Sequence, residues 1–176
     1  MKIKVKTLRQ YELLADVAEM PPITALVFLK ARRWLKVFRF PESVNNIPFE
    51  RFIQADKYKD NAKIVSHFIA AISGHKAPDL QRLPAHKMLG LYKRYSEQFT
   101  SIYKLFQEQD DFITSRGRAK FDMSEFGLTN IISFLAADDL QAYALLMHEP
   151  VSYIFVEYRR KIKKIENFNH NLPKQS

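Results

Sequence analysis

The hydrophobic positions of this chain recur mostly at helical spacing, and residues 47–74 show this most clearly. Pro48 suits the first turn of a helix, whose short apolar stripe ends at the charged run DKYKDN. A second stripe follows, and its members share one helical face: Ile64, Val65, Phe68, Ile69 and Ile72. Asp60 or Asn61 is suited to cap this second helix, and Gly74 to end it in a left-handed conformation. We therefore predict a short helix, a polar break and a longer buried helix.

The same spacing predicts helices in the rest of the N-terminal region. Residues 2–6 alternate polar and apolar and fit either a short edge strand or a frayed end. Thr7 is suited to cap a helix that reaches about Met20, and another helix is predicted across residues 22–38. The longest helix starts at about Pro84, and its apolar residues form an a/d seam: Met88, Tyr92, Tyr95, Phe99, Ile102 and Phe106. We expect this seam to pack within the domain, because it is aromatic and short for an independent coiled coil.

Three shorter helical patterns follow a polar stretch. Residues 109–121 lose the helical periodicity and gather charge, which is typical of a linker. Residues 122–168 contain three apolar patterns separated by an Asp-Asp pair and by Pro150, and residues 169–176 form a polar tail. We therefore predict an all-α fold, in which a basic helical domain at residues 1–108 is joined by a short linker to a small three-helix C-terminal unit.

Composition supports a folded protein. The chain has 176 residues, of which 47% are hydrophobic and 13% aromatic, so it can bury a sizeable core. The absence of cysteine excludes a disulfide framework and thiolate chemistry. The N-terminal sequence lacks the apolar core of a signal peptide, and no run approaches the roughly 20 apolar residues of a membrane span. We therefore expect a cytosolic protein that does not enter a membrane.

The positive charge lies in the first two thirds of the chain. The net charge is +9, and residues 1–120 hold 22 basic and 12 acidic side chains, against six and seven in residues 121–176. The densest basic stretch of the N-terminal half includes four candidate partner-binding residues: Arg32, Arg33, Lys36 and Arg39. A basic surface attracts nucleic acid or acidic protein, and composition does not choose between them. No helix-turn-helix, zinc-finger or RNA-recognition signature accompanies it.

The chain shows no catalytic or metal-binding motif. Its five histidines lack an i, i+4 histidine partner and the H-E-x-x-H spacing of a zinc helix. Side chains of neighbouring helical residues point about 100° apart, so the two Asp-Asp pairs do not form an acid/base dyad by spacing. A glycine-rich phosphate loop and a nucleophile elbow are also missing. We therefore predict a protein that is not an enzyme and has no catalytic, cofactor-binding or metal-binding residues.

The order of these patterns resembles a known family. The segment FGLTNIISFLAADDLQAYALLMHEPVSYIFVEYRRKI has an aromatic-led helix, an aspartate break, a short helix, a proline turn and a long amphipathic helix. It resembles the small C-terminal module of the tail assembly chaperones of long-tailed bacteriophages. IPFERFIQADKYKDNAKIVSHFIAAISG, followed by LPAHKMLGLYKRY, resembles their N-terminal domains. The two stretches cover about half of the chain. In many such phages the two modules come from a frameshifted pair of reading frames, whereas here both lie in one chain.

The resemblance implies a chaperone or adaptor that coats the tape measure protein and recruits tail tube subunits in the cytoplasm of the host cell. An apolar or acidic client would lie in grooves between amphipathic helices. To the basic stretch we therefore add four candidate partner-binding residues of the last helix: Tyr153, Tyr158, Arg159 and Arg160. The alternative for these residues is ordinary core for the tyrosines and solvated surface for the arginines. A virion structural protein, such as a neck, connector or minor component, and a nucleic-acid-binding protein are the competing hypotheses, and homo-oligomerisation is left open.

Overall fold

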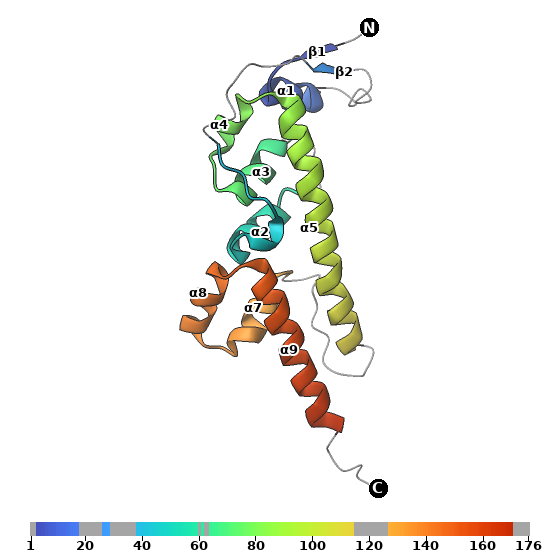
Figure 1. Cartoon of the computed structure of the whole chain (residues 1–176), viewed down its shortest axis with the longest axis vertical. Coiled ribbons are helices and arrows are strands. Elements are labelled where there is room, and N and C mark those ends of the chain that lie inside the picture. The colour runs from blue at the N-terminus through green and yellow to red at the C-terminus, as the bar shows by residue number, and fades with distance from the viewer. Residues whose placement is uncertain are drawn as a thin grey trace. The chain divides into compact units, whose positions relative to one another are not determined.

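A computed structural model of the chain describes residues 3–17, 26–28, 38–59, 61, 64–114 and 127–170. Within these residues the fold class is all-α, as predicted, with one short pair of strands (Figure 1). The helices are α1 (Leu8–Val17), the 3₁₀-helix η3 (Val44–Asn46), α2 (Phe49–Asp56), α3 (Val65–Ser73), α4 (Ala77–Gln81), α5 (Ala85–Thr114), α7 (Thr129–Ala136), α8 (Leu140–His148) and α9 (Val151–His170).

The chain divides into two compact units. The first consists of Met1–Ile47 and Arg51–Thr100, and the second of Pro48–Glu50 and Ser101–Ser176. This division differs from the predicted one, because a three-residue segment from the N-terminal half belongs to the second unit and α5 contributes to both.

The predicted linker starts too early. Residues 109–114 are the last residues of α5, whereas residues 115–121 lie outside the described part of the chain. Glutamine and glutamate are good helix formers that can extend a helix without an apolar face, so the loss of periodicity did not mark its end. The predicted tail also starts too early, because α9 includes residues 169 and 170.

The two strands correct one predicted helix. β1 (Ile3–Val5) pairs in parallel with β2 (Leu26–Phe28), so the edge-strand alternative for the start of the chain holds. The helix predicted across residues 22–38 is wrong at residues 26–28. Leu-Val-Phe suits a strand once another strand is available to pair with it. The rest of that predicted helix, apart from residue 38, lies outside the described residues.

Thr7 caps α1 as predicted. The Thr7 Oγ1 accepts a hydrogen bond of 3.4 Å from the backbone N–H of Gln10, and the Gln10 Oε1 accepts one of 3.2 Å from the backbone N–H of Thr7. This reciprocal pair is a capping box, which satisfies two N–H groups that a helix start would leave without partners.

The core of the first unit is aromatic. The ring of Phe52 stacks on that of Phe99 with 4.2 Å between centroids, and the ring of Phe68 meets that of Tyr92 edge-on at 5.3 Å. Five of the six seam residues of α5 are buried: Met88, Tyr95, Phe99, Ile102 and Phe106. The prediction that the seam packs within the N-terminal domain holds for Met88, Tyr95 and Phe99, whereas Ile102 and Phe106 belong to the second unit.

Two buried tyrosines of the first unit have raised pKa values. Burial raises the pKa of Tyr95, whose hydroxyl donates a 2.7 Å hydrogen bond to the backbone oxygen of Pro41. Burial also raises the pKa of Tyr11, and Tyr92 and Glu12 raise it further. Because the folded state holds these protons more tightly than the unfolded chain, both groups stabilise the fold below their ordinary pKa of 10.0. This stabilisation is lost as the pH rises through their raised folded pKa values.

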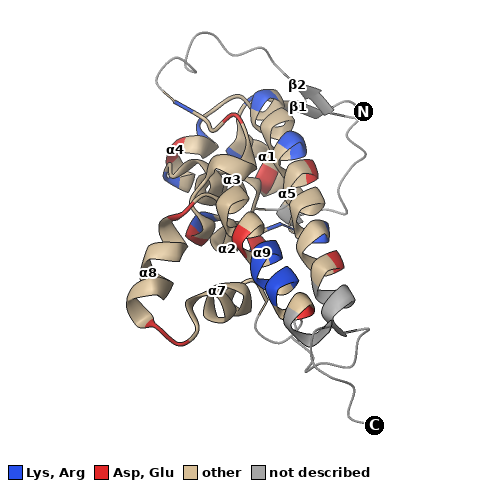
Figure 2. Ribbon diagram, turned by 60° about the horizontal axis from the view of Figure 1, so that its bottom comes forward, with Lys and Arg blue, Asp and Glu red and all other residues tan. Residues whose placement is uncertain are grey.

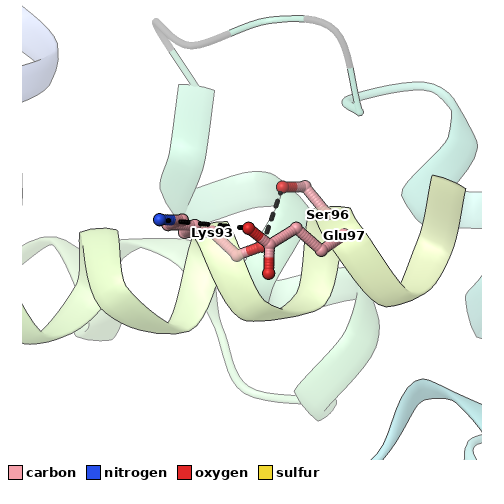
Figure 3. Close-up of polar contacts among 3 residues, drawn as sticks. All are labelled: Lys93, Ser96 and Glu97. Atoms are coloured by element: carbon pink, nitrogen blue, oxygen red, sulfur yellow. Dashed lines mark hydrogen bonds and ion pairs between the residues drawn. The ribbon is translucent and has the colours of Figure 1, made fainter.

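The solvent-facing side of α5 is polar. Lys93 Nζ lies 4.0 Å from Glu97 Oε1, and the Ser96 hydroxyl donates to the backbone oxygen of Lys93 at 3.1 Å (Figure 3). Both charged side chains are mostly exposed, so such a pair adds at most about 0.5 kcal/mol. The helix is therefore held mainly by its buried seam.

A buried acidic side chain caps α3. The N-cap residue of this helix is Ile64 and not Asn61, and it supplies no side-chain hydrogen bond, while Asp60 lies outside the described residues. Instead Glu12 of α1 accepts a 2.6 Å hydrogen bond from the backbone N–H of Ser66 through Oε1. Its Oε2 accepts a 2.9 Å bond from the Gln81 side chain. The carboxylate thus joins α1, α3 and α4, and its charge suits the positive end of α3.

Gly74 and Gly90 are expected to respond to alanine in opposite directions. Gly74 ends α3 at φ 76°, as predicted, and a Cβ there would lie 2.7 Å from the Arg51 guanidinium. Gly74→Ala should therefore destabilise the protein by about 1–2 kcal/mol through left-handed strain. Gly90 lies inside α5, and a Cβ added there would meet nothing within 4 Å. Gly90→Ala should stabilise the protein by about 0.5–1 kcal/mol, because alanine is the better helix former.

Urea unfolding followed by far-UV circular dichroism measures both changes. Equal effects of the two substitutions would contradict this account, since only Gly74 occupies a conformation that L-residues disfavour.

Candidate protein-binding surface

The C-terminal helices form the scaffold of the candidate site. Helix α7 packs against both α8 and α9 (Figure 1). Their buried side chains recur at helical spacing and share one core: Leu128, Ile131, Ile132, Ala136, Val151, Ile154, Tyr158 and Ile162. The last helix is amphipathic as predicted: Val151, Ile154, Tyr158 and Ile162 are buried at helical spacing, whereas Ile165 near its end is 39% exposed. The unit thus has the three predicted helices.

The segment Pro48–Glu50 completes this unit. The backbone N–H of Phe49 donates a 2.9 Å hydrogen bond to the oxygen of Glu149, and Pro48 and Pro150 form an isolated antiparallel bridge. His148 Nδ1 lies 3.6 Å from a carboxylate oxygen of Glu50. The start of α2 is therefore tied to the turn between α8 and α9.

A tight turn sets the direction of α8. Ala137 and Asp138 have φ angles of 52° and 69°, which place both in the left-handed region after α7. The Asp139 carboxylate then accepts hydrogen bonds of 2.8 and 3.2 Å from the backbone N–H groups of Gln141 and Ala142. Aspartate is among the preferred N-cap residues, and Asp139 of the Asp-Asp pair is the N-cap of α8.

Helix α8 is apolar but has no buried residue. Seven of its nine residues are Leu, Ala, Tyr or Met, yet none is buried. Leu140 is 84% exposed and Leu145 is 70% exposed. On α9, Tyr153 and Val156 are 45% and 59% exposed. Burying a leucine stabilises a structure by about 1.5–3 kcal/mol, so an apolar helix left exposed is a candidate binding surface.

A groove lies next to this helix. The α9 groove is lined by the end of α7, the last part of α8 and one side of α9: Leu135, Leu146, Tyr153, Glu157, Arg160, Lys161 and Lys164. Its volume is about 350 Å³, which lies within the range of roughly 300–1,000 Å³ for pockets that bind ligands. The α9 residues Tyr153, Glu157, Arg160 and Lys164 recur at helical spacing, so one face of α9 supplies most of its lining.

The charge of the groove is positive. Three cationic side chains line it against one carboxylate, and Figure 2 shows the basic residues as blue bands on α9. Arg160 Nη1 lies 3.5 Å from Glu157 Oε1. Lys161 Nζ donates to the backbone oxygens of Phe134 and Leu135 and lies 4.7 Å from the centroid of the Phe134 ring. Lys161 is thus partly engaged in holding the end of α7, whereas Lys164 is exposed.

The predicted site residues of α9 fall in three places. Tyr153 and Arg160 line the α9 groove, whereas Arg159 is exposed but does not line it. Tyr158 is 1% exposed and its ring packs against Phe106 and Phe134, which agrees with the core alternative for this tyrosine. Its side chain is therefore not at the surface.

Most of the predicted basic stretch is not described by the structure. Arg32, Arg33 and Lys36 lie outside the described residues. Arg39 is exposed, and its backbone oxygen lies 2.9 Å from His75 Nε2. Arg39 belongs to the first unit, whereas the predicted residues of α9 belong to the second.

Five residues that line the groove are not among those predicted from the sequence: Leu135, Leu146, Glu157, Lys161 and Lys164. Both lysines belong to the run RRKIKK, which lies in the middle of α9 because the helix continues to His170. The spacing from Arg160 to Lys164 is i, i+4, which places them on one side of a helix. The two leucines had no signal of their own, because their position in the groove depends on how α7 and α8 fold back on α9.

Comparison of the chain with protein-family models, with curated proteins and with solved structures found no match. Among the residues that the structure describes, no helix is long and apolar enough to cross a membrane. In the same part of the chain, no three His, Asp or Glu side chains gather as metal ligands would.

Proposed function

We propose that this chain is a non-enzymatic assembly chaperone or adaptor that binds a helical segment of another protein. The observation that carries this proposal is α8, an apolar helix with no buried residue that lies beside a groove of mixed apolar and basic lining. A protein that holds a client in this way needs an exposed apolar surface kept in place by a rigid scaffold.

The resemblance to tail assembly chaperones of long-tailed phages names the first client to test, which is the tape measure protein, and the tail tube protein as the second. It rests on the order of the helical patterns in the sequence. The three C-terminal helices and the buried seam of α5 have the order that these patterns predict.

Co-purification with the full-length tagged chain tests this function. The chain is co-expressed with a phage tape measure protein and a tail tube protein, and the bound proteins are identified by mass spectrometry. We expect the tape measure or tube protein to co-purify, and the double variant Leu140→Ser, Leu145→Ser to recover about tenfold less of it, since a handful of interface residues carries most of the binding energy. Leu13→Ser is the matched control, because Leu13 is 54% exposed on α1 in the other unit.

Two results would contradict this function. Recovery of nucleic acid without either protein would favour the nucleic-acid-binding hypothesis, whose affinity would also fall steeply with salt. Presence of the chain in purified virions at structural stoichiometry would favour a neck, connector or minor structural protein.

A further inference from the structure

We infer that the α9 groove binds an amphipathic helix whose charged flank is acidic. This inference rests on the proposed function, since it names the chemistry of the client segment and where that segment lies.

The apolar part of the groove comes from three helices. Leu135, Leu146 and Tyr153 supply it from α7, α8 and α9 in turn. The volume of about 350 Å³ accepts apolar side chains but not a globular domain. Residues 153–164 of α9 extend over roughly 16 Å at the rise of an α-helix, so a partner helix of three turns would match the groove in length.

The positive charge of the groove favours a negatively charged partner. Arg160 and Lys164 lie one helical turn apart on its wall, and the one acidic side chain of the lining, Glu157, already lies 3.5 Å from Arg160. Arg159 and Lys163 are exposed on the same helix but do not line the groove. A basic partner would meet repulsion along this wall, whereas glutamates beside an apolar stripe would form charge-assisted contacts.

A helix fits the lining better than nucleic acid does. A phosphate backbone would use the cations, but it offers nothing to cover Leu135, Leu146 and the exposed leucines of α8. An amphipathic helix contacts both the cations and the apolar side chains, because its apolar face enters the groove while its acidic flank lies against α9.

Fluorescence anisotropy with the full chain and a labelled designed peptide tests the inference. The probe is an amphipathic peptide of about 20 residues, long enough to form a helix, with leucines on one face and glutamates on the flanks. The comparison peptide has lysines in place of the glutamates. We expect the acidic peptide to bind at least about tenfold more tightly than the basic one at physiological salt.

A charge-matched pair of variants locates the binding. Arg160→Glu, Lys164→Glu should weaken binding of the acidic peptide by about tenfold or more. Arg159→Glu, Lys163→Glu changes the net charge equally on the same helix but outside the groove lining, so it should change affinity by less than about threefold. Tyr153→Ala should likewise weaken binding, whereas Val156→Ala should not, because Val156 is exposed without lining the groove.

Failure of this inference differs from failure of the proposed function. The groove assignment would be overturned if both charge variants lost affinity equally or if the acidic peptide did not bind. It would also be overturned if a single-stranded oligonucleotide bound more tightly than the peptide and its binding depended on Arg160 and Lys164. Self-association through the groove, seen as a dimer that the Arg160→Glu, Lys164→Glu variant abolishes, would also overturn it.

If the tape measure protein still co-purifies with the Arg160→Glu, Lys164→Glu variant, the client binds elsewhere and the proposed function stands. If the peptide binds as expected but neither phage protein co-purifies, the groove assignment holds and the proposed function fails.

Discussion

Replacement of Phe106 by alanine is expected to lower the free energy of unfolding by about 3–5 kcal/mol, as truncation of a buried phenylalanine typically does. Phe106 is fully buried. Its ring lies 5.9 Å from that of Phe49, 5.2 Å from that of Phe155 and 6.0 Å from that of Tyr158, between centroids. Alanine would remove these aromatic contacts and leave a cavity that the surrounding helices fill only partly.

Urea unfolding by far-UV circular dichroism gives the size of the effect, and hydrogen exchange gives its location. Because these rings all belong to the second unit, peptides from α7 and α9 should exchange faster in the variant. Leu105→Ala is the matched control, since Leu105 is the preceding residue of α5 and is 45% exposed. It should change the free energy of unfolding by less than about 1 kcal/mol. A similar effect of both substitutions would show that Phe106 is not part of the core.

Replacement of Glu12 by alanine is expected to cost about 2–4 kcal/mol, because hydrogen bonds to a buried charge are strong and their loss leaves buried donors without partners. Glu12 is 7% exposed and accepts from the backbone N–H of Ser66 and from the Gln81 side chain. The Ser66 N–H belongs to the first turn of α3, where no partner exists within the helix. Alanine would leave the Ser66 N–H without its acceptor and would remove one of the two acceptors of the half-buried Gln81 amide, which also donates to the Ser66 hydroxyl.

A conservative variant separates the charge from the hydrogen bonds. Glu12→Gln keeps one oxygen to accept from Ser66 but loses the charge at the helix N-terminus, so we expect roughly half the loss seen with alanine. Hydrogen exchange of the first turn of α3 should increase in the order wild type, Glu12→Gln, Glu12→Ala. No change in α3 protection would contradict the capping role of Glu12.

Local sequence patterns were sufficient to predict those elements whose structure depends on their own residues. The apolar face of α3, the end of that helix at Gly74, the cap at Thr7 and the buried seam of α5 all follow from spacing and residue type. These features depend on hydrogen bonds and solvent exposure within about ten residues, so the sequence around them determines them.

The site was predicted only in part. The sequence pointed to Tyr153 and Arg160, which line the groove, but also to Tyr158, which lies on the same helix and is part of the core. The sequence of one helix does not show which of its faces will be buried by its neighbours. On α9 this is decided by the packing of α7. The groove residues of α7 and α8 could not be named, since they approach α9 only through the left-handed turn at Ala137 and Asp138.

The sequence by itself determined the all-α class, most of the described helices and the apolar faces that they bury, because these follow from short-range periodicity. The tertiary structure alone decided the strand at Leu26–Phe28, the cap of α3 by Glu12, the place of Pro48–Glu50 in the second unit and the exposed state of α8. Each of these depends on partners far apart in the chain. A residue's own neighbours do not show which distant strand, carboxylate or helix will be available to it after folding.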